Sequence, residues 1–250
     1  MKQFDDQTHS MVQSADGSFT AYSTEYNEHY HSTKDGALQE SLQKHVIPAL
    51  SVKKEKKTLN ILDICFGLGF NTLATLHYIE REGLGCKVRI YSPELDSALV
   101  TSLPHFAYPK EFEKYKDMLT QLVQTGSYLD GSWDVELFVG DAREYIKRFE
   151  DHFDIVYQDA FSPATNPVLW TREYFADITK AMKSDGVLTT YSIALSTRLA
   201  LHENGFRIYL NEGEGYRKAT IASLGTLEGF EPVDMEHKIA CNPEARSLRD

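Results

Sequence analysis

The sequence lacks long apolar runs and is poor in cysteine. No run approaches the ~20 residues that a membrane-spanning helix needs, and the first ten residues, MKQFDDQTHS, contain no apolar segment typical of a secretory signal. The three cysteines, Cys65, Cys86 and Cys241, are odd in number, and their spacing suits neither a disulfide framework nor a zinc site. These absences predict a protein of the reducing cytoplasm with no membrane partner.

Basic residues are also in deficit. The chain has 26 lysines and arginines against 37 aspartates and glutamates, for a net charge of −11. Because phosphate binding depends on cationic surface, this balance argues against a protein that coats nucleic acid non-specifically, but it allows one local basic patch. The candidates are the pair Arg217 and Lys218 and the cluster Lys53, Lys54, Lys56 and Lys57. The cluster has a simpler interpretation as a solvated loop before a strand.

Signatures of several enzyme classes are absent. The sequence contains no HExxH, GxSxG or Walker pattern. His29 and His31 lie close together but lack a third ligand at a metal-binding spacing. We therefore predict no bound metal and interpret both histidines as polar loop residues.

Short apolar runs alternate with helical patterns, which favours an α/β fold with a mostly parallel sheet and helices on both faces. Seven strands are predicted, at residues 59–64, 87–92, 135–140, 153–158, 186–192, 206–210 and 219–224. The last two suit a terminal antiparallel hairpin. Helices are predicted at residues 36–50, 71–82, 142–150, 172–183 and 194–204.

No repeat, low-complexity segment or Pro/Gly-rich linker divides the chain, so we expect one domain over residues 1–250. Residues 1–50 would form an N-terminal extension, of which 1–30 show little periodicity. Residues 104–133 resemble a helical insertion. The polar residues 226–250 suggest a loosely held tail.

A glycine loop follows the first predicted strand, in the segment Asp63-Ile-Cys-Phe66-Gly67-Leu-Gly69-Phe-Asn71. Gly67 and Gly69 would allow a sharp turn and a close approach of backbone to a ligand. A helix that begins near Asn71 would point its N-terminus at that ligand. A tight strand-to-helix turn without a ligand explains the glycines equally well.

Acidic residues follow the next two predicted strands. Glu94 lies 25 residues after Gly69, close to the spacing at which an acid accepts hydrogen bonds from ribose hydroxyls in dinucleotide folds. Asp141, followed by Ala142, suits an acceptor for an adenine amine, and it suits an N-cap of the following helix equally well. Because ligands bind at the carboxyl ends of parallel strands, the three strand ends together favour a nucleoside cofactor.

The most distinctive segment, Tyr157-Gln-Asp159-Ala-Phe161-Ser-Pro163-Ala-Thr-Asn166-Pro167-Val-Leu-Trp170-Thr171, follows the fourth predicted strand. Asp159 can hydrogen-bond an amine or accept a proton, and Phe161 can present a π-face to a methyl group that carries partial positive charge. Two prolines stiffen the loop, and Trp170 adds a flat surface. The alternative is a rigid structural loop with a helix cap at Thr171.

These segments resemble the methyltransferase domain of MnmC-like tRNA 5-aminomethyl-2-thiouridine methyltransferases. The matching positions in the last segment are Asp159, Phe161, Pro163, Asn166, Pro167 and Trp170. The residues Tyr30, Ser32, Gly36 and Glu40 upstream, and Gly215, Arg217 and Lys218 downstream, are similar to other stretches of that family. The sequence departs from the family at Cys65 and Ala160, where glycine is usual. The flavin-dependent oxidase domain often fused to this domain has no counterpart in the 250 residues.

The resemblance implies a Rossmann-like class I methyltransferase that moves a methyl group from S-adenosylmethionine to the aminomethyl nitrogen of the tRNA wobble uridine. Asp159 and Phe161 would be catalytic. The implied cofactor residues are Asp63, Phe66, Gly67, Gly69, Asn71, Glu94, Asp141 and Ala142. The implied substrate residues are Tyr30, Pro163, Asn166, Trp170, Arg217 and Lys218, with Tyr30 and Trp170 stacking a base of the anticodon loop. A separate enzyme would supply the aminomethyl intermediate.

Two alternatives remain open. A spermidine-synthase-like aminopropyltransferase shares the fold and the Asp-Ala-Phe-Ser-Pro stretch, but its first loop is usually acidic, whereas the loop here contains no acid after Asp63. A non-catalytic binding module on the same fold would not require acids at three strand ends.

Overall fold

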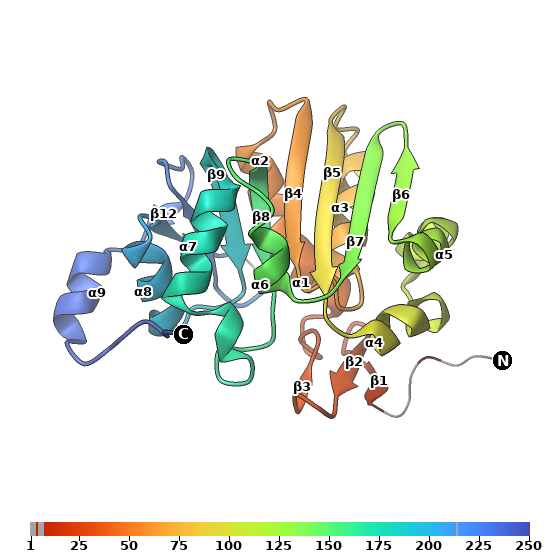
Figure 1. Ribbon diagram of the computed structural model, residues 1–250, viewed down its shortest axis with the longest axis horizontal. Coiled ribbons are helices and arrows are strands. Elements are labelled where there is room, and N and C mark those ends of the chain that lie inside the picture. The colour runs from red at the N-terminus through yellow and green to blue at the C-terminus, as the bar shows by residue number, and fades with distance from the viewer. Residues whose placement is uncertain (1–3, 5–7, 214) are drawn as a thin grey trace.

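The computed structural model describes Phe4, residues 8–213 and residues 215–250. In this part of the chain one large sheet organises the fold (Figure 1). Its strands, in order across the sheet, are β12 (Glu231–Pro232), β10 (Arg207–Asn211), β11 (Ala219–Ser223), β9 (Met182–Thr190), β8 (Phe153–Gln158), β4 (Thr58–Ile64), β5 (Lys87–Glu94), β7 (Trp133–Val139) and β6 (Ser127–Asp130).

The seven predicted strands form the centre of this sheet. Strands β9, β8, β4, β5 and β7 are parallel, and β10 and β11 form the predicted antiparallel hairpin. The short strands β6 and β12 add antiparallel pairs at the two edges. The prediction of a mostly parallel α/β sheet with a terminal antiparallel hairpin is confirmed.

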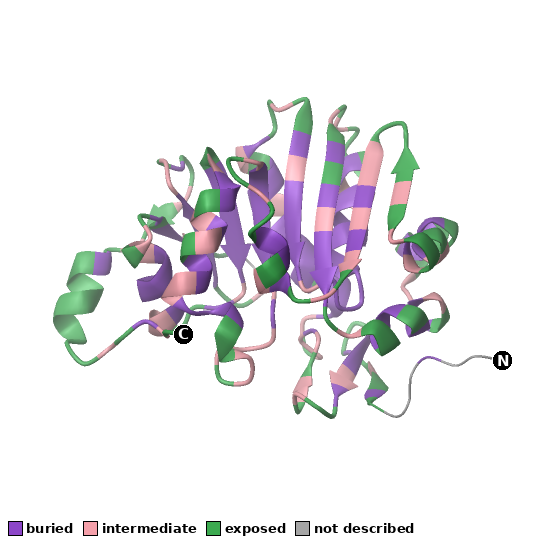
Figure 2. Cartoon of the chain, viewed as in Figure 1, coloured by how far each residue is buried: buried purple, intermediate pink, exposed green. Residues whose placement is uncertain are grey.

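Helices cover both faces of the sheet (Figure 1). One face carries the consecutive segments α1 (Ala37–Ser41), η1 (Leu42–Val46) and α2 (Ile47–Val52), together with α3 (Phe70–Arg81); the other carries α6 (Ala142–Ile146), α7 (Arg172–Ala181) and α8 (Leu195–Glu203). Strand β4 alternates between them: Ile61 packs into one core and Leu62 into the other. The central strands are accordingly buried (Figure 2). No helix among the described residues is long and apolar enough to cross a membrane.

The helix predicted over residues 36–50 is present, but its middle is irregular. Leu38, Leu42, Val46 and Leu50 are buried as the periodicity predicts. Residues 42–46 form a π-helical turn, η1, between α1 and α2. Such a turn holds one residue more than an α-turn and rotates the side chains that follow it, and π-turns occur frequently at functional sites.

The segment predicted as a helical insertion is only partly helical. It contains the 3₁₀ helices η2 (Leu103–His105) and η3 (Lys110–Tyr115) and the helix α5 (Lys116–Thr125), which follow α4 (Ser97–Ser102). The prediction is wrong for residues 127–133, because β6 pairs with β7. Gly126, at φ 75°, ends α5 and lets the chain reverse into that strand.

The N-terminal extension contains strands that its weak periodicity does not predict. Strands β1 (His9–Gln13), β2 (Phe19–Ser23) and β3 (Glu28–His29) form a separate antiparallel sheet, while residues 1–3 and 5–7 lie outside the described part of the chain. Asp16-Gly17, between β1 and β2, is a dipeptide typical of hairpin turns and was the one local indication of these strands. Figure 1 shows this small sheet below the carboxyl ends of the central strands.

The C-terminal residues are held rather than loose, which corrects the expectation for residues 226–250. After α9 (Met235–Cys241), which is mostly exposed (Figure 2), the chain returns to the start of α7. There the backbone N–H of Arg172 donates to the carbonyl of Leu248 at 2.9 Å, and the Thr171 hydroxyl donates to Asp250 at 2.7 Å. Met235 and Leu248 add apolar contacts with the core, but they are too far apart in the sequence to form a stripe, so hydrophobic periodicity does not predict this contact.

The lysine cluster lies at the amino ends of the parallel strands, just before β4. Lys53 is buried, with its ammonium 3.2 Å from the carboxylate of Asp185, and Lys56 pairs with Asp154 and Asp185. The cluster is therefore only partly the solvated loop that the sequence suggested, and two of its charges are neutralised.

Candidate active site

A cavity of about 1110 Å³ lies at the carboxyl ends of β4, β5, β7, β8 and β9. Its floor is made by the loops that leave these strands, and the N-terminal segment around β3 and the beginning of the helix at Ala37 form the opposite wall. Because the strands are parallel, their carboxyl ends meet at one edge of the sheet, where α/β folds bind ligands.

Gly67 and Glu94 are adjacent on the cavity wall. The backbone N–H of Gly67 donates to one oxygen of Glu94 at 2.8 Å, and the N–H of Asp96 donates to the other at 2.9 Å. Burial raises the pKa of Glu94, although the two backbone N–H groups partly oppose this effect. Each carboxylate oxygen keeps a second lone pair, so Glu94 can still accept hydrogen bonds from a ligand.

The position of Asp141 is compatible with both predictions made for it, a helix N-cap and a hydrogen-bond acceptor in the cavity. It is the N-cap of α6, with its side chain accepting from the N–H of Arg143 at 2.8 Å, and it lines the cavity together with Ala142. Gly67, Glu94 and Asp141 come from three successive parallel strands and thus converge as the sequence predicts.

The other four residues predicted for the cofactor lie behind this wall: Asp63, Phe66, Gly69 and Asn71 do not line the cavity. The ring of Phe66 occupies the space beside Gly69, where a Cβ would lie 2.8 Å from it. Gly69, at φ 77°, begins α3 in a left-handed conformation that favours glycine. The prediction that these four contact the cofactor is not supported by their placement, because they shape the loop from behind.

Asp63 is a fully buried carboxyl group. It accepts from the hydroxyl of Thr72 at 2.8 Å, and the side-chain amide of Asn71 lies 3.4 Å from its other oxygen. Burial raises the pKa of Asp63 to about 7 despite these hydrogen bonds. Its protonation therefore changes near neutral pH.

Asp159 faces the cavity from the end of β8, and buried neighbours hold both of its oxygens. The amide of Asn71 donates to one oxygen at 2.8 Å, and Nε2 of His45 lies 3.3 Å from the other. Burial alone would favour the neutral acid, but the charge and contact of His45, together with His31 and Asn71, outweigh it and lower the pKa of Asp159. The carboxylate is ionised and aimed by its surroundings.

Phe161 lies at the centre of an aromatic wall. Its ring stacks on Tyr26 with centroids 4.7 Å apart and meets the edge of Tyr30 at 4.9 Å. All three rings line the cavity. The ring of Tyr30 also closes on the glycine loop, since a Cβ on Gly67 would lie 3.1 Å from it.

Trp170 does not contribute to this wall, contrary to the prediction that it stacks a base. It is fully buried, and its indole N–H donates to the carbonyl of Phe161 at 2.7 Å. Its ring packs against Phe175 and Tyr191. Trp170 therefore supports the Phe161 backbone from beneath, as in the alternative of a rigid structural loop, and Thr171 caps α7 as that alternative also requires.

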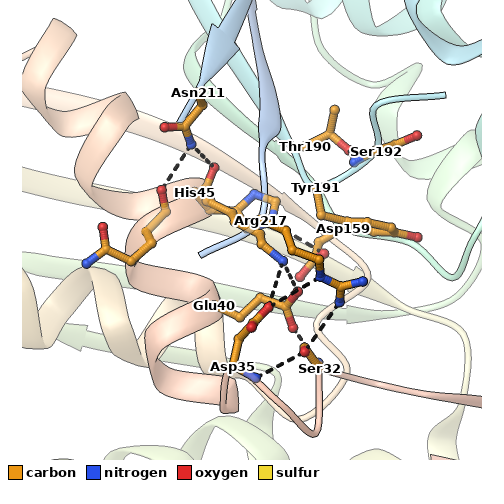
Figure 3. Close-up of polar contacts among 12 residues, drawn as sticks. Ser32, Asp35, Glu40, His45, Asp159, Thr190, Tyr191, Ser192, Asn211 and Arg217 are labelled. Carbon is orange, nitrogen blue, oxygen red and sulfur yellow. Dashed lines mark hydrogen bonds and ion pairs between the residues drawn. The ribbon is translucent and has the colours of Figure 1, made fainter. Parts of the chain in front are cut away.

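Of the remaining predicted substrate residues, some line the cavity and one does not. Asn166, Arg217 and Lys218 line the cavity, whereas Pro163 does not. Arg217 lies 3.7 Å from the carboxylate of Asp35 (Figure 3), and Lys218 pairs with Glu212 at 2.5 Å. Acidic partners thus accompany both charges of the predicted basic patch.

Several residues that line or support the cavity were not predicted from the sequence. His45, which contacts Asp159, lies on a helix whose only pattern in the sequence is its apolar stripe. Tyr191, which follows β9, donates to the carbonyl of Ala160 at 2.9 Å and so fixes the loop after Asp159. Glu28 accepts from the backbone and hydroxyl of Ser162, which links β3 to that loop. Contacts between segments this distant in the chain leave no signal in sequence spacing. Among the described residues no group of histidine, cysteine, aspartate and glutamate is arranged to hold a metal.

Comparison with known proteins agrees with this arrangement. Residues 109–225 match a family of S-adenosyl-L-methionine-dependent methyltransferases. The crystal structure of MnmC2 from Aquifex aeolicus is similar over 99% of this chain and 81% of that one, with a TM-score of 0.86 and 32% identity. Spermidine synthase from Thermotoga maritima has a TM-score of 0.55 at 18% identity, covering 90% of this chain and 72% of that one, a likeness of fold alone.

Curated relatives point the same way. An uncharacterized protein of Methanocaldococcus jannaschii is 34% identical over 97% of this chain and 67% of its own length. The tRNA 5-methylaminomethyl-2-thiouridine biosynthesis bifunctional protein MnmC of Azoarcus sp. is 28% identical over 86% of this chain, which spans about a third (35%) of that protein. Fold and site therefore define an S-adenosylmethionine-dependent methyltransferase. Within that class, the chain belongs to the family that includes MnmC2 of Aquifex aeolicus.

Proposed function

We propose that residues 1–250 act as one methyltransferase domain, which moves the methyl group of S-adenosylmethionine to the aminomethyl nitrogen of 5-aminomethyl-(2-thio)uridine at the tRNA wobble position. One observation carries the proposal: an ionised carboxylate, Asp159, faces the same cavity as the wall formed by Gly67, Glu94 and Asp141. An acid beside a nucleoside-binding wall suits an amine substrate.

The residues at the first three strand ends fit the cofactor. Glu94 offers free lone pairs to ribose hydroxyls, Asp141 can accept from the adenine amine, and Gly67 leaves room for close approach. When bound, S-adenosylmethionine supplies an electrophilic methyl group on a sulfonium. Phe161 and Tyr26 wall the cavity with π-faces, which attract positive charge.

Asp159 performs the chemistry that falls to the protein. An alkylamine is mostly protonated at neutral pH, and only the free base has a lone pair for attack. The carboxylate would bind the ammonium, orient the nitrogen and take up the departing proton, which then passes to water. The lone pair left on the nitrogen would form the bond to the methyl carbon, while the sulfur keeps the electrons of the broken carbon–sulfur bond. Alignment of the reacting groups supplies much of the rate enhancement in such transfers.

The partner in this proposal is tRNA, through its anticodon loop. Arg217 and Lys218, at 71% and 61% side-chain exposure, are the candidates for phosphate contacts beside the cavity. Tyr30 remains the candidate for stacking on the base. With a tRNA substrate the enzyme would act in the cytoplasm, and a separate enzyme would supply the aminomethyl group.

The aminopropyltransferase alternative has weaker support. Its structural relative is similar at only 18% identity, and the first loop contains Cys65 and Phe66 rather than an acid. The non-catalytic alternative does not explain why Asp159 is held ionised within the cavity.

Purified protein tests the proposal directly. We expect it to methylate tRNA that carries 5-aminomethyl-2-thiouridine when S-adenosylmethionine is added, with the product read by mass spectrometry of nucleosides. Decarboxylated S-adenosylmethionine with putrescine, in a parallel reaction, should yield no spermidine. Spermidine formation would establish the alternative, and absence of S-adenosylmethionine binding would refute any transferase function.

A further inference from the structure

His45 has no place in the proposed chemistry, yet it is among the most completely buried polar residues of the chain. Its exposed fraction is 0%, and it lies in the π-turn η1 of the helix that borders the cavity. Its ring meets the edge of Tyr157 on β8, with centroids 5.8 Å apart. Burial of a polar ring destabilises the fold unless partners inside the protein replace the hydration that the ring loses.

The two ring nitrogens of His45 face different partners. Nδ1 lies 3.1 Å from the hydroxyl of Thr189 on β9. Nε2 lies 3.3 Å from Asp159, and Figure 3 shows these two side chains. A hydroxyl can donate to Nδ1, whereas an ionised carboxylate can only accept. Nε2 therefore bears a hydrogen whether the ring is neutral or charged. The Thr189 hydroxyl can donate to Nδ1 of the neutral ring or accept from Nδ1 of the charged ring.

Asn71 completes the arrangement from the other side. Its amide donates to the second oxygen of Asp159 at 2.8 Å. Asn71 on α3 thus holds one oxygen by a hydrogen bond, and His45 in η1 lies at ion-pair distance from the other, so rotation of the carboxylate would disturb both contacts. Orientation of a reacting group by its own neighbours is a common requirement of catalytic sites.

We propose that His45 is a positioning residue for Asp159, which fixes the direction of the carboxylate and keeps it ionised for the amine substrate. This inference rests on the proposed function for its role in turnover, but the contact with Asp159 does not depend on it. The extra residue of the π-turn serves to bring the imidazole to the carboxylate.

Other charged and titratable groups near Asp159 contribute to its electrostatic surroundings. They are His31 after β3, Glu40 and Lys44 on the same helix as His45, Asp63 on β4, Cys65 in the glycine loop and Tyr191 after β9. Burial opposes ionisation of Asp159 and His45 is the largest influence that favours it, so removal of His45 leaves burial without its main counterweight.

Substitution of His45 separates positioning from packing. His45→Leu removes both nitrogens at similar volume, whereas His45→Gln retains an N–H that can reach Asp159. We expect His45→Leu to lower kcat by roughly 10- to 100-fold with little change in S-adenosylmethionine affinity. In the pH profile of kcat for His45→Leu, the acid limb should move to higher pH because the pKa of Asp159 rises. Higher pH should therefore restore part of the activity. His45→Gln should retain most of the turnover.

A second measurement needs no substrate. Carbon-13 NMR of labelled aspartate should show a higher pKa for Asp159 in folded His45→Leu than in the wild-type protein, with Asp159→Asn used to assign the signal. An unchanged pKa of Asp159, or an unchanged acid limb in an active His45→Leu variant, would overturn the positioning role. If the wild-type protein fails to methylate tRNA while this pKa still shifts, the proposed function fails and the contact stands.

Discussion

At the scale of single residues, Asp159 shows what a motif can and cannot convey. Its position after the fourth parallel strand was sufficient to predict a carboxylate in the cavity. Its charge state was not, because that depends on His45 and Asn71, which approach from helices 114 and 88 positions earlier in the chain. For Trp170 the motif led to a wrong prediction. The residue belongs to the same motif as Asp159, yet its side chain is fully buried and is not free to stack on a base.

Asp159→Asn keeps the shape of the side chain and removes its charge. We expect kcat to fall by roughly 10²-fold or more, the usual scale for a positioned acid–base group. Affinity for S-adenosylmethionine should change little, since Glu94 and Asp141 lie apart from it on the cavity wall. Activity should recover partly at higher pH, where more amine is free base. Steady-state kinetics of the variant, with the exposed Asp117→Asn as control, measures this; near-normal turnover would make Asp159 a structural residue.

Asp63 predicts a pH dependence of stability. Its pKa is about 7 in the folded chain and near 3.8 when unfolded, so the folded state binds the proton more tightly. The stability from this proton is complete below the unfolded pKa and is lost as pH rises towards 7. Wild-type protein should therefore lose roughly 1 kcal/mol per pH unit relative to Asp63→Asn between about pH 5 and pH 7. Urea unfolding of both proteins across this range gives the difference; a constant difference would contradict the raised pKa.

At the scale of elements, regular strands and helices were predictable and the irregular ones were not. The seven central strands can be recognised in the sequence as short apolar runs between glycine turns. Strands β1 to β3 escaped notice because they are short and only partly buried. The apolar stripe does not predict the π-turn η1, because Leu38, Leu42, Val46 and Leu50 are four positions apart both before and after it.

The loop between β4 and α3 depends on one carboxylate of the neighbouring strand. Glu94 accepts the N–H groups of Gly67 and Asp96, and it is predicted to bind the ribose as well. Glu94→Ala should weaken S-adenosylmethionine binding by roughly 1–3 kcal/mol. Calorimetric titration, with the exposed Glu82→Ala as control and circular dichroism to verify folding, tests this. Equal affinities in the two folded variants would remove Glu94 from the cofactor site.

At the scale of the whole molecule, the net charge of −11 limits how tRNA can bind. We propose that tRNA binds through a local patch that contains Arg217 and Lys218, whose charges are accompanied by Asp35 and Glu212. The slope of log affinity against log salt should therefore be shallow, about −2 to −3, which corresponds to roughly three phosphates. Arg217→Ala with Lys218→Ala should lower tRNA affinity and leave cofactor affinity unchanged. Filter binding across salt concentrations measures both; unaltered tRNA binding by the double variant would place the patch elsewhere.

The small N-terminal sheet has a consequence for how the protein is made. Glu28 and Ser162, which join it to the loop after β8, are 134 residues apart, and His45 and Thr189 are 144 apart. During synthesis the first wall of the cavity therefore leaves the ribosome long before the opposite wall exists. Local contacts can form the early hairpin, but the distant pairs incur loop-closure entropy and form late. A bound cofactor can thus stabilise only the completed chain and offers no protection to its folding intermediates.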